Sequence, residues 1–242
     1  MEILFELEPV SKREKLVERV RALTGLVDWV DVPDSPMGVF RFSSPIVSCI
    51  VKSLEPELGV VAHLRVVDVS RVALEAIVKG LEMCGVERVV FVRGDVVAGS
   101  SIVRDVEPEE AVEITRTTTR LQPGLTISLR RSVSEIEERL KIGAPFYLVL
   151  NLNKSNIDKM EAVSKIARRL GVKLYPYVVL LTEGNRDRVL SLMEKWKLLE
   201  PGEALEVVSY SIGNGLADGI IVSSPADFKG GLRFVEELRK RL

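Results

Sequence analysis

The sequence has few of the residues that most often carry chemistry. Its 242 residues include one histidine, two cysteines and only 5% aromatic residues. Cys49 and Cys84 stand far apart in apolar helical contexts, without a CxxC or Cys/His partner, so we expect buried thiols and neither a zinc site nor a disulfide framework. Gln122 is the only glutamine, which together with the high charge content is a weak indication of a thermophilic source.

Net charge and long apolar runs are also lacking. The 34 basic and 35 acidic residues leave a net charge of -1, so no long-range field attracts nucleic acid or an anionic membrane. No run approaches the roughly 18 apolar residues that a membrane-spanning helix needs, and residues 1–6 lack the basic region of a signal peptide. We therefore expect a cytoplasmic protein with neither nucleic acid nor membrane as a partner.

Alternating strand and helix patterns run through the whole chain. Apolar, β-branched runs of strand length are separated by amphipathic helical stretches, which is typical of a parallel sheet with crossover helices. Eight such units predict an α/β fold, a single (β/α)8 barrel over residues 1–242. The predicted strands are residues 2–8, 27–33, 58–66, 87–93, 124–130, 146–152, 173–181 and 219–223.

Three helical stretches carry clear boundary signals. Ser11 and Glu14 have the spacing of a capping box at the start of the first helix. Residues 155–170 place their apolar side chains on one stripe and stop at Gly171, a residue favoured just after a helix. Within residues 198–218, flanking glycines and a proline bracket a short helix before the eighth strand.

Polar residues gather at the predicted strand ends, where barrel enzymes place their catalytic groups. On the first strand Glu6 and Glu8 share the parity opposite to the apolar face, which turns both carboxylates toward the barrel mouth. Each pair could instead be ordinary solvated surface, and His63 could be a satisfied core imidazole. The other pairs are Asp31 and Asp34, His63 and Arg65, Arg93 and Asp95, Ser128 and Arg130, Asn151 and Asn153, Thr182 and Glu183, and Ser223 and Ser224.

The end of the eighth strand allows a further interpretation. Ser223, Ser224 and Pro225 precede Gly230 and Gly231, and barrels often bind phosphate near this strand. The spacing matches no strong fingerprint, so it is a weak indication.

Three motifs together resemble methylenetetrahydrofolate reductase, a flavin-dependent barrel enzyme of one-carbon metabolism and methionine biosynthesis. Residues 5–9, Phe-Glu-Leu-Glu-Pro, are similar to the family's opening strand. Residues 62–68, which begin Ala-His-Leu, resemble its third strand, and residues 89–95, which end Arg-Gly-Asp, resemble its fourth. Residues 32–38 and 218–223 add weaker similarity to the second and eighth strands.

The resemblance implies a function and a set of site residues. Glu6 takes the place of the general acid, and Asp95 is implied to act in catalysis beside it. The implied flavin-binding residues are His63, Val92, Arg93, Gly94, Asp95 and Arg139. The implied substrate-binding residues are Glu6, Asp34 and Asn151. The substrate would be a reduced folate or related pterin, and the flavin would be FAD, or else FMN, with NAD(P)H as a possible electron donor.

The chain departs from the family pattern at several positions. Pro33 and Leu150 stand where the family has a threonine and a glutamine, and Ser128 to Arg131 replace a Tyr-Pro-x-x-His stretch that helps to hold the flavin. These differences leave two alternatives open: a flavin-independent, pterin-dependent one-carbon or methyl transferase, or a non-catalytic barrel subunit with a partner polypeptide. A homo-oligomer and a barrel of unrelated function are also compatible with the sequence.

Overall fold

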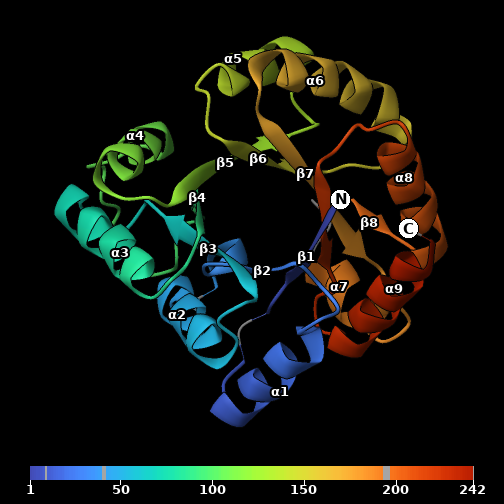
Figure 1. Ribbon diagram of the computed structural model, residues 1–242, viewed down its shortest axis with the longest axis horizontal. Coiled ribbons are helices and arrows are strands. Elements are labelled where there is room, and N and C mark those ends of the chain that lie inside the picture. Colours follow the sequence, from blue (N-terminus) through green and yellow to red (C-terminus); the bar gives the residue numbers. More distant parts are fainter. Residues whose placement is uncertain (9, 40–41, 193–196, 242) are drawn as a thin grey trace.

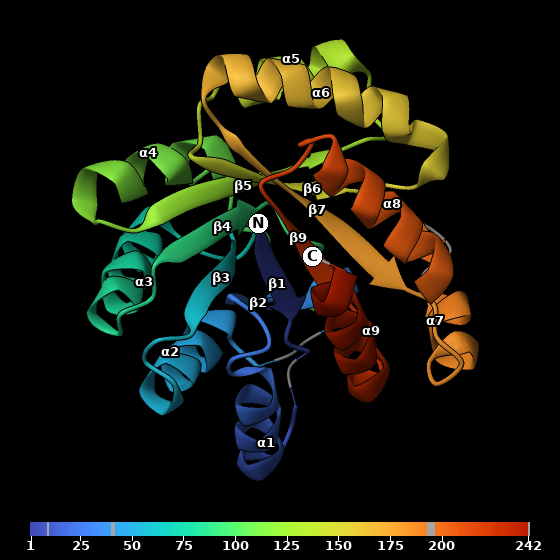
Figure 2. The same cartoon turned by 45° about the vertical axis from the view of Figure 1, so that its right-hand side comes forward.

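The computed structural model describes residues 1–8, 10–39, 42–192 and 197–241 and confirms the (β/α)8 barrel. Figure 1 shows the strands at the centre with helices around them, and Figure 2 shows the same arrangement from another side. Every strand pairing is parallel, and the pairing of β6 with β7 closes the sheet. The barrel strands are β1 (Glu2–Glu6), β2 (Trp29–Val32), β3 (Gly59–Arg65), β4 (Arg88–Val92), β5 (Gln122–Ser128), β6 (Phe146–Leu150), β7 (Lys173–Leu180) and β9 (Gly219–Ser223).

The eight predicted strands agree with these bounds to within two residues at each end. A ninth strand, β8 (Leu198–Leu199), pairs with the end of β7. The alternation along β1 is as expected: Ile3, Phe5 and Leu7 pack in the layer between strands and helices. Leu4 instead belongs to the cluster inside the barrel. Because side chains alternate along a strand, Glu2 and Glu6 also point inward, one toward each end.

Helices cover the outside of the barrel. They are α1 (Arg13–Leu23), α2 (Ser44–Leu54), α3 (Arg71–Met83), α4 (Pro108–Thr118), α5 (Val133–Leu140), α6 (Ile157–Leu170), α7 (Arg186–Leu192), α8 (Pro201–Gly213) and α9 (Phe228–Arg241), with short 3-10 turns η1 (Pro36–Gly38) and η2 (Lys154–Asn156). The helix before Gly171 is confirmed, with Gly171 at a φ of 70°, and α8 confirms the short helix before the last barrel strand. None of the helices in the described ranges combines the length and apolar character needed to cross a bilayer.

The predicted start of the first helix is wrong. The helix begins at Arg13, and Lys12 occupies the position before it without a side-chain hydrogen bond. Ser11 therefore lies one residue too early to cap the free backbone N–H groups. The first turn keeps Glu14, whose negative charge is favourable at a helix N-terminus.

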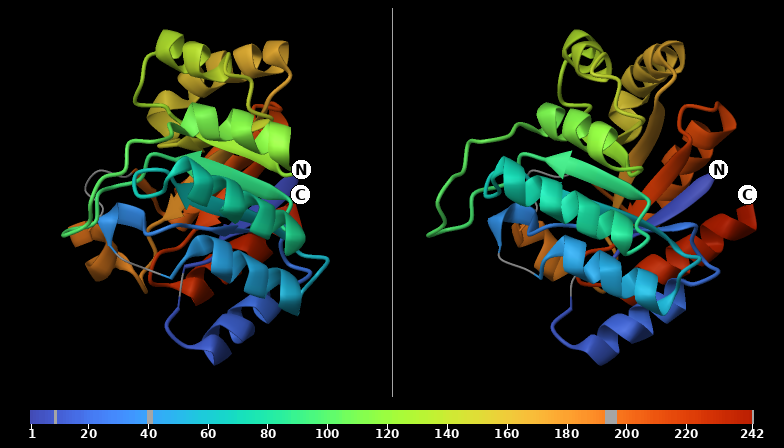
Figure 3. Two further views of the ribbon diagram at one scale, coloured as in Figure 1. Left: turned by 90° about the vertical axis from the view of Figure 1, so that its left-hand side faces the viewer. Right: turned by 60° about the vertical axis from the view of Figure 1, so that its left-hand side comes forward.

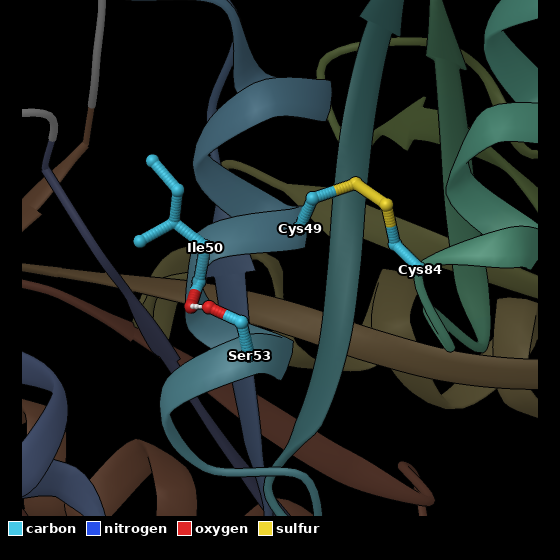
Figure 4. The surroundings of a disulfide bond; sticks show 4 residues. All are labelled: Cys49, Ile50, Ser53 and Cys84. Atoms are coloured by element: carbon cyan, nitrogen blue, oxygen red, sulfur yellow. Dashed lines mark hydrogen bonds between the residues drawn. A yellow bond between two sulfur atoms is a disulfide. The ribbon is translucent and has the colours of Figure 1, made fainter.

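The prediction for the cysteines is also wrong, because Cys49 and Cys84 form a disulfide (Figure 4). Cys49 lies on α2 and Cys84 directly follows α3, and these helices pack side by side as consecutive crossovers. Their Cα atoms are 5.3 Å apart, within the range that a disulfide can span. Both residues are half-buried rather than buried. The prediction failed because the two cysteines are 35 residues apart in the sequence, and only the fold brings them together.

The connection between β4 and α4, residues 93–107, is a long loop at the C-terminal ends of the barrel strands. Figure 3 shows it extending away from the end at which both chain termini lie. Val103 donates its backbone N–H to Val67, 2.7 Å away, which ties this loop to the loop after β3. The loop begins with Arg93, Gly94 and Asp95, so its course decides where these three predicted site residues lie.

Candidate active site

Polar side chains lie inside the barrel at the C-terminal ends of its strands, and those of five strands form one group. The group consists of Glu6 of β1, Asp31 of β2, His63 of β3, Tyr177 of β7 and Ser223 of β9. Their positions follow from alternation: Leu4, Val61, Tyr175 and Ile221, each two residues earlier on its strand, lie in the interior cluster, as does Trp29 at its edge. Below them, an apolar layer separates this group from the other end of the barrel. Catalytic groups of barrel enzymes occupy this end.

Asp31 is the centre of the group. One of its carboxylate oxygens, Oδ1, lies 2.8 Å from His63 Nε2, and the other, Oδ2, accepts a hydrogen bond from the Tyr177 hydroxyl. Asp31 is fully buried, and His63 and Tyr177 are 8% and 5% exposed. A buried carboxylate is tolerated only when it is paired and hydrogen-bonded, and both oxygens of Asp31 meet that condition.

The surroundings of His63 favour the protonated form of its imidazole. Burial alone would lower the pKa of the imidazole, but the charge of Asp31 and the hydrogen bond to it outweigh burial and raise the pKa above its ordinary value. The nearby carboxylate of Asp34 contributes in the same direction. The Asp31 and His63 side chains therefore form an ion pair inside the barrel mouth.

Glu6 lies beside this ion pair and keeps its proton. Burial and then the nearby negative charge of Asp31 raise the pKa of Glu6 to about 8, against opposing contributions from His63 and from a hydrogen bond with Ser223. The carboxyl groups of Glu6 and Asp31 both lie near His63, and the imidazole is already hydrogen-bonded to Asp31. Glu6 is therefore a neutral carboxylic acid at pH 7, a state suited to donating a proton.

Two predicted substrate residues lie near the mouth in different settings. Asp34 accepts a hydrogen bond from the Arg65 backbone N–H at 3.2 Å, and burial raises the pKa of Asp34. Asn151 follows β6 with a φ of 68° and donates from Nδ2 to the Ser128 hydroxyl at 3.0 Å. The inward-facing residue before it is Leu150, half-buried against the interior cluster.

The predicted flavin residues of β4 do not converge on Glu6. Val92 points into the barrel beside the interior cluster, which gives Arg93 the outward parity. The Arg93 side chain is 72% exposed and forms an ion pair of 2.6 Å with Glu107. Asp95 is exposed, and its backbone oxygen accepts a hydrogen bond from Arg65 at 3.0 Å.

Gly94 and Arg139 also contact other residues of the protein rather than an open site. Gly94 has a φ of 86°, and a Cβ placed on it would lie 3.0 Å from the Arg65 side chain, so neighbouring protein atoms account for the glycine. Arg139 lies on α5, donates from Nε to the Thr126 backbone oxygen at 2.7 Å and pairs with Glu109 of α4. These residues do not form a cradle with free donors for the phosphates and ring of a flavin.

The weak phosphate prediction at the last strand meets an acidic side chain. Asp227 lies just before α9 and accepts hydrogen bonds from the Gly230 backbone N–H at 2.9 Å and from the Thr182 hydroxyl at 2.7 Å. A Cβ on Gly230 would lie 2.1 Å from the Asp227 carboxylate. A carboxylate of the chain thus occupies the helix N-terminus where a phosphate would bind.

Tyr177 is the site residue that the sequence analysis did not name, and Asp31 and Ser223 were named among the polar strand ends without a catalytic role. Asp31 and Ser223 are polar strand ends among several, and Tyr177 lies in an apolar run in which an aromatic residue is typical of a core. The available signal is strand parity, because each of the three follows an inward-facing residue by two positions. The chain matches no family model, and no curated protein matches it.

Proposed function

We propose that this protein is an enzyme acting on the one-carbon unit of a reduced pterin, methylenetetrahydrofolate or a related methylene-tetrahydropterin, with Glu6 as the general acid. The observation that carries the proposal is the Glu6 carboxyl group opposite Asp31, beside the buried Asp31–His63 pair at the C-terminal ends of the barrel strands. The resemblance of residues 5–9, 62–68 and 89–95 to methylenetetrahydrofolate reductase indicates the substrate class. A pKa of about 8 leaves Glu6 able to donate its proton near neutral pH.

The acid step opens the methylene bridge between two pterin nitrogens. Glu6 donates its proton to one bridging nitrogen, the bond from that nitrogen to the methylene carbon breaks, and the second nitrogen and the carbon become an iminium cation. Glu6 is left as a carboxylate. The electron pair of the broken bond stays on the protonated nitrogen, so charge and atoms balance.

The charges of the site suit this step. Before it, the neutral Glu6 and the Asp31–His63 pair sum to zero. After it, they sum to one negative charge next to a substrate that has become a cation. A group that gains charge where the opposite charge develops lowers the barrier more in a buried site than in water.

Reduction of the iminium carbon to a methyl group requires a hydride donor. The resemblance implies FAD or FMN, reduced by NAD(P)H, and a flavin would supply that hydride. Arg93, Gly94, Asp95 and Arg139 do not fit a flavin as they lie, because their side chains or backbones are engaged by Glu107, Arg65 and Glu109. We therefore derive no step through a flavin.

A second candidate is a flavin-independent transferase, in which a nucleophile rather than hydride takes the one-carbon unit from the iminium. The engagement of Arg93 and Arg139 by acidic residues favours it. The two candidates share the Glu6 step and differ in the species that then attacks the iminium carbon. A non-catalytic subunit would need no such acid.

Exchange of the one-carbon unit tests the acid step without any hydride donor. The iminium releases its carbon to water as formaldehyde, so an enzyme that forms it accelerates exchange of labelled formaldehyde into the methylene-tetrahydropterin. We expect the unmodified protein to accelerate exchange and Glu6→Gln to reduce the rate about 100-fold or more, the usual range for loss of a general acid. Glu8→Gln, two residues further on and half-buried, is the matched control. It removes only one of the smaller contributions to the pKa of Glu6, so it should slow exchange far less than Glu6→Gln.

The outcomes separate the alternatives. No acceleration by the unmodified protein would contradict the proposal, and equal rates for Glu6→Gln and Glu8→Gln would remove Glu6 from the role of acid. Visible absorbance after mixing with FAD or FMN and gel filtration then separates the two candidates. A retained flavin that is reduced by NAD(P)H favours the reductase, and active protein without bound flavin favours the transferase.

A further inference from the structure

We propose that Asp31 is a positioning residue that keeps the proton on Glu6, because Asp31 holds His63 as its own ion-pair partner and so denies Glu6 a counter-charge. Tyr177 supports this role by donating to the second oxygen of Asp31. The resemblance assigned His63 to flavin binding and gave Asp31 no role. The substrate-independent part of the inference concerns only where the proton lies, and its kinetic consequence rests on the proposed function.

The geometry makes Asp31 the preferred partner of His63. Asp31 Oδ1 lies 2.8 Å from His63 Nε2 of the neighbouring strand β3. On its other side, Asp31 is opposite Glu6 in the parallel pair of β1 and β2. The Tyr177 hydroxyl fixes the other oxygen from β7, across the barrel. With both oxygens bonded and the carboxylate fully buried, Asp31 has no rotamer freedom with which to release His63.

The groups that face Glu6 come from every strand beside it. They are Glu8 on its own chain segment, Asp31 from β2, His63 from β3, Tyr177 from β7 and Ser223 from β9. His63 is the cation of this set, and Asp31 and Glu8 are acidic. If Asp31 lost its charge, His63 would have Glu6 as its remaining partner in this set, and the imidazolium would stabilise the Glu6 carboxylate.

Two substitutions therefore shift Glu6 in opposite directions. Asp31→Asn removes the repulsion that Glu6 feels and frees His63 to act as its counter-ion, so Glu6 should ionise at a pH lower by one unit or more, the usual effect of a nearby opposite charge. His63→Gln removes the cation and leaves Asp31, so Glu6 should ionise at a higher pH than in the unmodified protein. A merely structural role of Asp31 would not give opposite signs.

Spectroscopy tests this without substrate. His63 is the only histidine of the chain, so a single pair of imidazole 15N resonances reports its charge, and the infrared carbonyl band of a protonated carboxylic acid, assigned by its loss in Glu6→Gln, reports Glu6. Titration of the full chain should show the Glu6 band lost near pH 8, at lower pH in Asp31→Asn and at higher pH in His63→Gln. Asp28→Asn is the matched control, since Asp28 precedes the same strand and pairs with Arg239 outside the barrel.

Kinetics give the second readout. In the exchange assay the alkaline limb of the pH profile should move with the infrared titration in each variant. An unchanged Glu6 titration in folded Asp31→Asn would overturn the inference. If Asp31→Asn does not fold, a His63→Gln titration at or below that of the unmodified protein would overturn it equally. Titrations that shift as expected in a protein without exchange activity would leave the inference standing and remove the proposed function instead.

Discussion

At both ends of the barrel interior, a glutamate of β1 lies with a tyrosine of β7. At the N-terminal end, Glu2 accepts hydrogen bonds from the Tyr175 hydroxyl at 2.7 Å and from two Arg88 nitrogens at 2.8 and 3.2 Å. Burial alone would raise the pKa of Glu2, but the hydrogen bonds from Arg88 and Tyr175 outweigh it and hold the pKa below its ordinary value. At the C-terminal end, Glu6 has a pKa of about 8.

The cation explains why the two ends differ. Arg88 is 4% exposed, and its guanidinium lies 3.7 Å from the centre of the Trp29 ring, with Tyr175 and Phe146 on other sides. A guanidinium does not lose its proton in proteins, so Glu2 is fixed as its partner at any ordinary pH. At the other end the cation is a histidine, which can lose its proton, and it belongs to Asp31. The Glu2–Arg88 group at the N-terminal end therefore stabilises the fold, and the Glu6–Asp31–His63 group at the C-terminal end can exchange protons.

The largest effect on stability is expected at the N-terminal end of the barrel interior. Arg88→Met should lower the free energy of unfolding by about 3 kcal/mol or more, because it leaves a half-buried carboxylate without its partner. Chemical denaturation at pH 7 measures this. Arg93→Met is the control, since the Arg93–Glu107 pair is exposed and worth about 1 kcal/mol or less. Equal losses of unfolding free energy in the two variants would mean that the interactions of Arg88 with Glu2 and the aromatic rings contribute no more than a surface ion pair.

The architecture was predictable because strand and helix periodicities differ and the alternation persists over the whole chain. Burial of Ile3, Phe5 and Leu7 against helices, which turns Glu6 inward, follows from the same periodicity. The disulfide was not predictable, because sequence spacing does not show that α2 and α3 bring Cys49 and Cys84 together. The helix start at Arg13 was missed because the capping-box spacing puts Ser11 at the N-cap position, whereas in the structure Lys12 occupies it.

The site was only half predictable, for a different reason. Arg93 and Asp95 were predicted as site residues from motif similarity, which depends on residue identity alone. Because side chains alternate along β4 and Val92 points into the barrel, Arg93 points outward. Tyr177 carries no polar signal in an apolar run, and its role depends on a carboxylate 146 residues away in the chain. Which carboxyl keeps a proton depends on the distances among Glu6, Asp31 and His63, and sequence carries no such distances.

A medium effect is expected from pH. The pKa of Glu6 is higher in the folded state, about 8, than the ordinary value of 4.5, so folding holds a proton that the unfolded chain releases. That contribution is complete below about pH 4.5 and is lost as the pH rises through about 8. Glu6→Gln should remove it and flatten the decline of stability between pH 5 and pH 8 by an amount on the order of a few kcal/mol.

His63 contributes with the same sign and remains in that variant. Its pKa is raised in the folded state, so its contribution is present below the unfolded pKa and is lost as the pH rises through the folded one. A shallow decline should therefore persist in Glu6→Gln. Thermal unfolding at several pH values measures both, and Glu8→Gln should keep most of the slope, because Glu8 makes one of the smaller contributions to the pKa of Glu6. An unaltered slope in Glu6→Gln would show that Glu6 is ionised in the folded protein.

The two tyrosines give the smallest and sharpest comparison, because Tyr175 and Tyr177 lie on one strand and each donates a hydrogen bond to a carboxylate inside the barrel. Tyr177→Phe should lower the free energy of unfolding by about 1 to 2 kcal/mol, since Asp31 is left with His63 alone. Tyr175→Phe should cost less, because Glu2 keeps both bonds from Arg88. Only Tyr177→Phe should move the imidazole 15N titration of His63. A shift of that titration in Tyr175→Phe would mean that the apolar layer does not isolate the two ends, and that the division between a structural end and a proton-exchanging end is wrong.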